Sequence, residues 1–406
     1  MSLLYLIEQL DRSRFAPSIL FNAPPGDAVE PFARRGIPIF HEPGITTYPH
    51  AQGALLQLRS LRPWQMVTWG LAIRPSARRF EAFLGKHPHD LVHLNSAVQI
   101  PAAIGARRAG VPVVWHVREE LHPGFLGVRR AMVRRTVDRC ADAVIAISER
   151  NAAQLRRSSK VHVVYNFLDF DRFDRRRDRD AARRAIGLPV DRPIVIMLGG
   201  MVPHKGADVL VQAAERLRVV RPDVLFVVAG IPPAGAVSPS AVRRVLRGAL
   251  ESAGLIENVE REVMRLMEQF RLQDTVRFIG MRSDVPELLA AADVLVWPAT
   301  VSHFSRPVIE AGAMGRPVVA SDFPSSRELV TQGVTGLLVP PRQPGPLAEA
   351  IQRILADPVE AARMGEAGWR LARERYDARR NAEAILAIYE KILGAGADAT
   401  IQGAKS

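Results

Sequence analysis

The sequence predicts an α/β protein with two doubly wound, Rossmann-like domains that face each other across a cleft. Short β-branched runs alternate with helical patterns along the chain, and the whole alternation occurs twice. The strand candidates are continuously apolar, which is typical of parallel sheets covered by helices on both faces. The 406 residues are too many for one ordinary domain and suit two.

The expected elements follow from these runs in chain order. In the first half, strands are predicted at 17–23, 37–42, 91–96, 111–117, 143–148 and 161–166, with helices at 3–11 and 98–109. In the second half, strands are predicted at 194–200, 224–230, 276–280, 294–299, 317–322 and 336–341, with helices at 207–219, 284–292 and 346–355. Each half therefore has the strand–helix alternation of a parallel sheet.

A polar, charged stretch, "DFDRFDRRRDRDAARRAIGLPVDRP", separates the two halves and has the composition of a domain boundary. The predicted domains are 1–185 and 186–377. A helix at 378–394 is expected to pack back on the first domain. Doubly wound sheets bind ligands at the carboxyl ends of their strands, so the function should lie in the strand-to-helix loops.

The composition limits the possible functions. The chain is 48% hydrophobic and 24% charged, with a net charge of +13 that favours polyanions or reflects solvated arginine-rich helix faces. A helix-turn-helix or RNA-binding signature is absent, so nucleic acid is not an expected partner. One cysteine, Cys140, fits a reducing compartment. We expect a cytoplasmic protein, because no apolar run reaches the ~20 residues of a membrane span and no signal peptide opens the chain.

Two loops of the second half could bind a ligand. After the strand at 194–200, Gly199 and Gly200 allow a tight turn, and Lys205 and Gly206 open a helix whose N-terminus suits phosphate. The spacing fits neither a Walker loop nor a dinucleotide fingerprint, and an ordinary turn with a solvated lysine is an equal alternative.

The second loop follows the strand at 294–299. A helix is expected from near Pro307, with Arg306 just ahead of it. Glu310 would then lie in the first turn, where a carboxylate favours the helix dipole and can accept hydrogen bonds from hydroxyls. The alternative is a surface acid that only stabilises the helix.

The second half resembles the donor domain of retaining GT-B glycosyltransferases, family 4 (glycosyl transferases group 1). The resemblance lies in "GGMVPHKGADVLVQA", "RFIGMRSDVPELLAAADVLVWPA", "FSRPVIEAGAMGRPVVASD" and "ELVTQGVTGLLVPP". The first half is similar more loosely, through "DLVHLNS", "VPVVWHVRE" and "ADAVIAISE". The resemblance implies transfer of a sugar from a nucleotide-sugar to a glycan or lipid-linked acceptor, with retained anomeric configuration and without a metal or other cofactor.

The resemblance also implies roles for particular residues. Glu310 matches the second acid of the family's E-x7-E motif, which holds the ribose hydroxyls, and Lys205 matches the lysine on the donor diphosphate. Arg282 lies in the loop that packs against the base. The donor-binding set is Gly199, Gly200, Lys205, Gly206, Arg282, Ser302, Phe304, Ser305, Arg306 and Glu310.

In the first half, His116 matches a histidine near the reacting sugar and completes a catalytic set with Lys205 and Glu310. Asn95, at the end of the strand 91–96, is a weaker acceptor-side candidate. His93 in the same strand is expected to be structural.

The sequence departs from the family pattern in several places. Ser302 stands where E-x7-E has its first acid, and Gly200 stands where an arginine is common, so Arg306 is expected to substitute as a diphosphate cation. Met1 leads directly into the first helix, so the first strand of the N-terminal domain is missing. We interpret this as a translation start assigned too late or a truncated gene.

Two functions remain open at this point. The first is a glycosyltransferase of cell-surface polysaccharide or glycolipid synthesis, whose arginine-rich segment at 129–135 rests on the anionic inner face of a membrane. The second is a non-catalytic relative that binds a nucleotide-sugar in a degenerate, truncated site. A sugar-nucleotide epimerase fits the loops of Lys205 and Glu310 less well.

Overall fold

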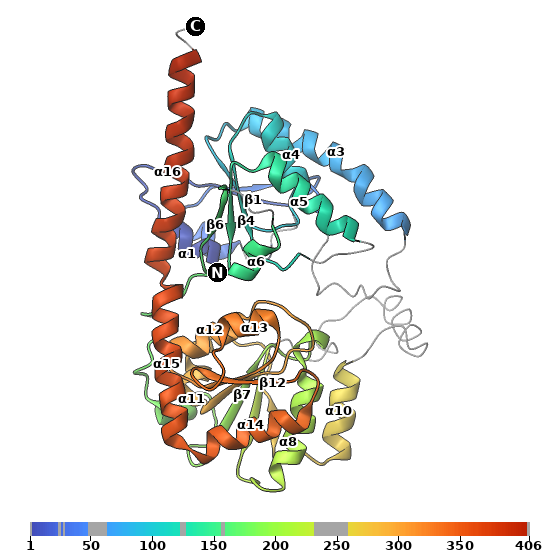
Figure 1. Ribbon diagram of the computed structural model, residues 1–406, viewed down its shortest axis with the longest axis vertical. Helices are drawn as coiled ribbons and strands as arrows, with labels where there is room; N and C mark the ends of the chain where they lie inside the picture. The colour runs from blue at the N-terminus through green and yellow to red at the C-terminus, as the bar shows by residue number, and fades with distance from the viewer. Residues whose placement is uncertain are drawn as a thin grey trace. The chain divides into compact units, whose positions relative to one another are not determined.

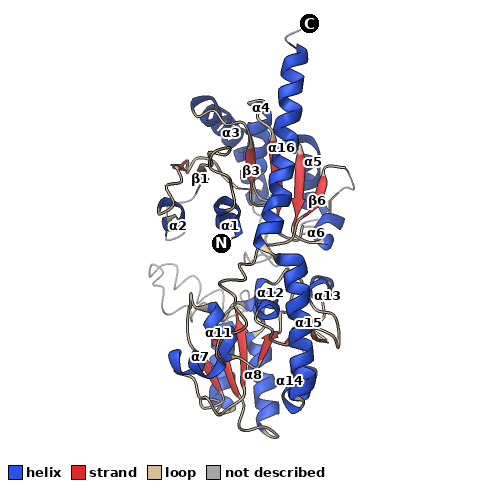
Figure 2. Cartoon of the chain, turned by 90° about the vertical axis from the view of Figure 1, so that its left-hand side faces the viewer, coloured by secondary structure: helices blue, strands red, loops and turns tan. Residues whose placement is uncertain are grey.

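The computed structural model describes residues 2–22, 26, 29–47, 63–121, 127–155, 159–230 and 259–403. The chain forms two compact units, Met1–Phe167 with Tyr376–Ser406, and Leu168–Arg375 (Figure 1). Both units contain parallel sheets with helices packed on them (Figure 2). The predicted α/β fold with two Rossmann-like domains is confirmed.

The second unit has one parallel sheet with the strand order β12-β11-β10-β7-β8-β9. Its strands are β7 (Ile194–Leu198), β8 (Leu225–Ala229), β9 (Val276–Phe278), β10 (Val294–Trp297), β11 (Val318–Ser321) and β12 (Gly336–Val339). Its helices are α7 (Arg179–Ala185), the 3-10 turn η2 (Pro203–Lys205), α8 (Ala207–Arg218), α10 (Val259–Gln269), α11 (Val285–Ala291), α12 (Arg306–Ala313), α13 (Pro324–Leu329), α14 (Pro344–Ala356) and α15 (Pro358–Tyr376). The chain starts in the middle of the sheet at β7 and extends first to one side and then, from β10, to the other.

The strands of this unit form its core because both of their faces are apolar. β7 and β8 are buried at every position. Alternate strand residues pack with α8, α10 and α14 in one cluster that includes Val195, Phe226 and Val296. Outside that cluster, α11 contacts both α7 and α12. Helices therefore cover both faces of the sheet, which is why its strands are apolar at consecutive positions, as predicted.

The first unit contains α1 (Ser2–Glu8), β1 (Ile19–Phe21), α2 (Glu30–Ala33), β2 (Ile39–His41), α3 (Pro63–Lys86), β3 (Val92–Leu94), α4 (Ile100–Arg108), β4 (Val113–Val117), α5 (Val128–Cys140), β5 (Ala143–Ala146), α6 (Glu149–Ala153), β6 (Val161–Val163) and α16 (Ala378–Gly403). Val113, Trp115 and Val117 of β4 pack with α3, α4 and α5. Val114 packs on the opposite face with α1 and α16. Successive residues of β4 point to opposite faces of the sheet, and helices bury both faces.

The strands of the first unit form two separate sheets among the described residues. β3, β4, β5 and β6 form one, and β1 pairs only with β2. Side chains join the two: Ser18 Oγ lies 2.8 Å from His89 Nε2, and the ring of Phe40 lies 5.2 Å from that of Phe83.

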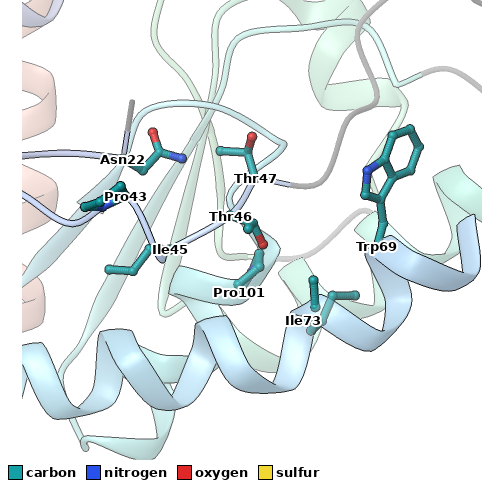
Figure 3. Close-up of a pocket in the computed structure, with 9 residues that line it drawn as sticks. Asn22, Pro43, Ile45, Thr46, Thr47, Trp69, Ile73 and Pro101 are labelled. Atoms are coloured by element: carbon teal, nitrogen blue, oxygen red, sulfur yellow. The ribbon is translucent and has the colours of Figure 1, made fainter. Parts of the chain in front are cut away.

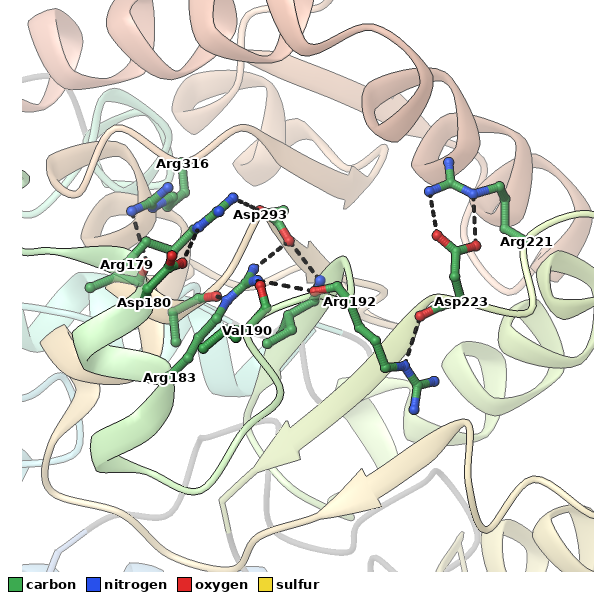
Figure 4. A network of polar contacts seen from close by, with 12 residues as sticks. Arg179, Asp180, Arg183, Val190, Arg192, Arg221, Asp223, Asp293 and Arg316 are labelled. Carbon is green, nitrogen blue, oxygen red and sulfur yellow. Dashed lines mark hydrogen bonds and ion pairs between the residues drawn. The ribbon is translucent and has the colours of Figure 1, made fainter.

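The boundary between the units falls after Phe167, which corrects the predicted boundary after residue 185. The charged stretch is not a solvated linker, because α7 packs against α11 in the second unit. Arg183 is only 1% exposed. Its guanidinium donates to the Ala291 carbonyl at 2.8 Å and to Asp293 Oδ2 at 2.7 Å (Figure 4). The buried Arg183 cation, with these hydrogen bonds made, stabilises the packing of residues 168–185 in the second unit.

The C-terminal helix α16 packs on the first unit. Ala382, Ile385 and Ile388 of α16 lie in one apolar cluster with Val114 and Ile145 of the sheet. In addition, the Asn381 amide donates to the carbonyl of Tyr165 at 3.1 Å. The chain therefore returns to its first unit after completing the second.

Candidate functional site

Two loops of the second unit meet where the order of its strands reverses. β7 and β10 are neighbours in register, with Leu295 opposite Ile196, although strands β8 and β9 and helices α8, α10 and α11 lie between them along the chain. The Thr300 backbone N–H donates to the His204 carbonyl at 3.1 Å, which joins the loop after β10 to the loop after β7. This reversal point at the carboxyl ends of parallel strands is the usual ligand position in such a sheet.

Gly206 allows the two loops to approach this closely. Its φ is 79°, in the left-handed region, and it immediately precedes α8. A Cβ atom placed there would lie 2.0 Å from the Pro298 carbonyl oxygen. Any other residue would force the loops apart, so glycine is required both by the backbone and by the space.

Lys205 is a half-buried cation whose contacts among the described residues are with neutral groups. Its Nζ lies 2.8 Å from Nε2 of His303 and 4.4 Å from the centre of the Trp297 ring. His303 Nδ1 lies 3.0 Å from the Val301 carbonyl, so Nδ1 carries the hydrogen and Nε2 accepts from the ammonium. Burial and the neighbouring Lys205 lower the pKa of His303 to about 4, so its ring is neutral at pH 7.

Burial also lowers the pKa of Lys205 to about 8. Among the residues that the structure describes, no carboxylate pairs with its ammonium. A desolvated cation without an anion is stabilised by any anion that enters. The loop therefore has the electrostatics of an anion-binding site.

Glu310 provides the opposite charge on α12, the helix that follows the loop after β10. It is 7% exposed, and its Oε1 accepts from Arg306 Nε at 2.6 Å. Burial raises the pKa of Glu310, while Arg306 and Arg172 oppose the rise. The prediction that Glu310 lies in the first turn is wrong: α12 begins at Arg306, so the acid is its fifth residue. It is held by its i–4 arginine.

Apart from Arg282, the remaining predicted donor-binding residues belong to the loops after β7 and β10. Ser302 Oγ lies 2.9 Å from Ser325 Oγ. Ser305 is 3% exposed, and its hydroxyl has no hydrogen-bond partner among the described residues. Phe304 is half-buried. Gly199 and Gly200 both donate to the Ala229 carbonyl, at 2.8 and 3.1 Å, which forms the turn after β7.

The structure does not bring Arg282 to this cluster. It follows β9, the outer strand, and its exposed guanidinium pairs with Asp284, where Nε lies 2.8 Å from Oδ1. No described contact joins it to Lys205 or Glu310.

In the first unit, His116 lies inside β4 and not in a loop. It is 1% exposed, and burial lowers its pKa well below the usual range. The side chain at the edge of the sheet is Arg118, which the sequence did not single out. Its guanidinium donates to Oδ1 of Asn95 at 3.0 Å and to Oδ1 of Asn166 at 2.6 Å. Asn95, Arg118 and Asn166 thus form a polar cluster beyond the ends of β3, β4 and β6. Of the two predicted acceptor-side residues, Asn95 belongs to this cluster and His116 is not among its hydrogen-bond partners.

A separate hollow of about 400 Å³ lies at the ends of β1 and β2 (Figure 3). Asn22 follows β1, and Pro43–Thr47 follow β2. The lining is mostly apolar: Pro43, Ile45, Trp69, Ala72, Ile73 and Pro101, with Asn22, Thr46 and Thr47 as polar members. Pattern reasoning could not find it, because its residues come from four distant segments.

None of the helices in the described part of the chain is long and apolar enough to cross a membrane.

Comparisons with known proteins agree with this architecture. Residues 178–370 match the family model described as glycosyl transferases group 1, and residues 1–172 match glycosyltransferase family 4. The alpha-D-kanosaminyltransferase of Streptomyces kanamyceticus is 27% identical over 80% of this chain and 81% of its own length. A D-inositol 3-phosphate glycosyltransferase of Streptomyces avermitilis is 30% identical over 72% of this chain, which spans 64% of that relative.

A solved structure shows the same fold. The Anabaena protein HepE in complex with UDP has a TM-score of 0.74 and 22% identity, covering 96% of this chain and 95% of that chain. Together the two family models cover both units almost completely. The chain is therefore a glycosyltransferase of the GT-B fold and belongs to family 4, glycosyl transferases group 1.

Proposed function

We propose that this glycosyltransferase moves a sugar from a nucleoside diphosphate donor to a glycan or lipid-linked acceptor, with retention of anomeric configuration, in cell-surface polysaccharide or glycolipid synthesis. The proposal depends on one observation. Lys205 ends the loop after β7 and has no carboxylate partner among the described residues, and the buried carboxylate of Glu310 lies in α12, the helix that follows the loop after β10. These two loops meet at the reversal point of one sheet. A nucleoside diphosphate has matching groups, a diphosphate and a ribose diol.

Each side chain has one part in the transfer. Lys205 binds the diphosphate and offsets the charge that grows on it as the bond to the anomeric carbon breaks. Glu310 accepts hydrogen bonds from both ribose hydroxyls. The acceptor oxygen forms its bond to the anomeric carbon on the face that the phosphate leaves, and its proton passes to that phosphate. Lys205 supplies the positive charge, and we propose no metal or other cofactor.

UDP is the first donor fragment to test, since the related fold of HepE has been solved with UDP and with UDP-glucose bound. We expect UDP to raise the melting temperature of the protein by mass action. Lys205→Ala and Glu310→Ala should each reduce this shift, while Lys86→Ala, at an exposed site on α3, should not. Full retention of the shift in both site variants would contradict the assignment.

The acceptor side is proposed to face an anionic membrane. The helices α3, α4 and α5 cover one face of the first sheet. Their exposed arginines include Arg74, Arg78, Arg107, Arg108 and Arg135. The segment at 129–135 contributes less than its sequence indicates, because Arg129 is only 7% exposed.

Vesicle binding tests this face. Replacing Arg74 and Arg78 by glutamine should weaken binding to phosphatidylserine vesicles about thirtyfold, at about 1 kcal/mol for each basic residue near the surface. The matched pair Arg184→Gln and Arg342→Gln removes the same charge from exposed sites of the second unit. Equal losses in both pairs would mean that charge alone, and not this face, attracts the membrane.

A binding protein without turnover is the second candidate. Ser302 places a hydroxyl, hydrogen-bonded to Ser325, where the family has an acid. Release of UDP from UDP-sugars, with and without acceptor glycolipid, separates the two. UDP binding with no turnover of any donor would favour the second candidate.

A further inference from the structure

Three rings of the first unit form a hydrogen-bonded series from its C-terminal helix to its sheet. The Tyr389 hydroxyl on α16 lies 2.5 Å from Nδ1 of His93 on β3. Nε2 of His93 lies 3.3 Å from Nδ1 of His116 on β4. Neighbouring rings meet edge to face, at 81° and 68°. Tyr389 is 7% exposed and His116 is 1% exposed, so both ends of the series are shielded from bulk water, while His93 between them is half-buried.

All three rings are uncharged at neutral pH. Burial, helped by the Arg118 guanidinium, lowers the pKa of His93 to about 3 and that of His116 well below its usual range. Burial raises the pKa of the Tyr389 phenol above its usual range. Each imidazole therefore carries one hydrogen and the phenol carries one. These three hydrogens must fill two hydrogen bonds.

Only two directions are possible for the series. In the forward direction, Tyr389 donates to His93 Nδ1, His93 Nε2–H donates to His116 Nδ1, and His116 carries its hydrogen on Nε2. In the reverse direction, His116 Nδ1–H donates to His93, which donates to the Tyr389 oxygen.

The forward direction leaves fewer buried donors and acceptors without a hydrogen bond. The Tyr389 hydroxyl has His93 as its polar contact among the described residues. The reverse direction would therefore leave the buried phenol hydrogen without an acceptor and the His116 Nε2 lone pair without a donor. The forward direction leaves only the His116 Nε2–H unsatisfied. Unmade hydrogen bonds of buried groups are costly, so the forward direction is the more stable one.

In the forward direction, the Nε2–H of His116 is the donor left available to a ligand. His116 Nε2 is buried and has no hydrogen-bond partner among the described residues. His116 is the penultimate residue of β4, close to the carboxyl edge of the sheet. We propose that Tyr389 and His93 are positioning residues that fix His116 as an Nε2–H donor to a substrate oxygen, and so prevent it from acting as a base. The substrate in this inference rests on the proposed function, whereas the position of the hydrogen does not.

The position of the hydrogen can be measured in the free protein. Long-range 1H–15N correlation spectra of protein with 15N-labelled histidine distinguish the two tautomers, and His116→Gln and His93→Gln assign the two rings among the ten histidines. We expect hydrogen on Nε2 of both rings. Hydrogen on Nδ1 of His116 would overturn the inference.

Two tyrosine variants test the role of the phenol. Tyr389→Phe removes the hydrogen that sets the direction, so His116 should populate both tautomers to comparable extents. Tyr5→Phe is the matched control, because Tyr5 is 9% exposed in the same apolar cluster. It should leave His116 with hydrogen on Nε2. An unchanged tautomer in folded Tyr389→Phe would refute the positioning role.

A transfer assay separates a donor from a base. His116→Gln keeps an N–H group and should retain a kcat about tenfold above that of His116→Ala, as expected for one hydrogen bond. Equal loss of kcat in both variants would overturn the donor role. If UDP does not bind, the proposed function fails, while the tautomer measurements still decide the hydrogen-bond direction.

Discussion

The titration of Lys205 gives a quantitative test of the donor site. Burial lowers its pKa to about 8 in the free protein. A bound diphosphate favours the charged form and raises that pKa, so binding takes up a proton when the pH is above about 8. The sign follows directly: affinity for the diphosphate is full below this pKa and falls as the pH rises through it.

The size of the effect follows from the protonated fraction. With a pKa of about 8, about 90% of Lys205 is charged at pH 7 and about 10% at pH 9. If only the charged form binds, the Kd for UDP rises about tenfold between these two values. The phosphate does not titrate in this range, because its last pKa is about 6. A solvated lysine, with a pKa near 10.4, would give almost no change.

Isothermal titration calorimetry of UDP at pH 7, 8 and 9 measures this change. Uridine is the control for titration of the base, because it lacks the phosphates. Lys205→Arg should bind with an affinity that is nearly independent of pH, since a guanidinium stays charged. A Kd for UDP that is equal at pH 7 and pH 9 would refute the reasoning that Lys205 is a desolvated cation awaiting an anion.

Three further predictions concern the second unit. Glu310→Gln should weaken UDP binding about tenfold or more, through loss of charge-assisted hydrogen bonds worth about 1.5–3 kcal/mol, but should not weaken inorganic pyrophosphate binding in the same calorimetric assay. Asp293→Ala should lower the free energy of unfolding in urea by about 3–5 kcal/mol, because it leaves Arg183 buried without its anion; Asp223→Ala, from an exposed pair, should lower it by about 0–1 kcal/mol. Gly206→Ala should abolish UDP binding in a thermal-shift assay through its clash with the next loop, whereas Gly187→Ala, equally left-handed but with open space, should not.

The strand–helix alternation predicted the architecture because each strand is buried on both faces and is therefore apolar throughout. It also placed Lys205 and Glu310 correctly after β7 and β10, since strand-to-helix loops of a parallel sheet share one edge. The doubly wound class also implies that the first and fourth strands of the sheet, β7 and β10, are neighbours, as the structure has them. The register of this pair was not predictable, because it comes from pairing between segments that are distant in the sequence.

Composition did not predict which charged side chains are buried. The stretch around Arg183 has the composition of a linker, yet its guanidinium is buried among backbone carbonyls and one carboxylate. Similarly, His116 lies near the end of β4, inside the predicted strand 111–117, but the polar group just beyond that end is Arg118, which the sequence did not single out. A sequence pattern shows which groups are charged and does not show which partners desolvate or satisfy them.

His303 explains why the lysine of this site can remain available to a ligand. A carboxylate in place of His303 would keep the pKa of Lys205 high, but it would also compete with the incoming diphosphate for the same ammonium. A neutral imidazole orients Nζ through one hydrogen bond and leaves the charge uncompensated. The cost is a lowered pKa, which the bound diphosphate reverses. Glu310 is arranged in the opposite way: its charge is already balanced by Arg306 on its own helix, so it can accept from neutral hydroxyls without repelling the diphosphate bound beside it.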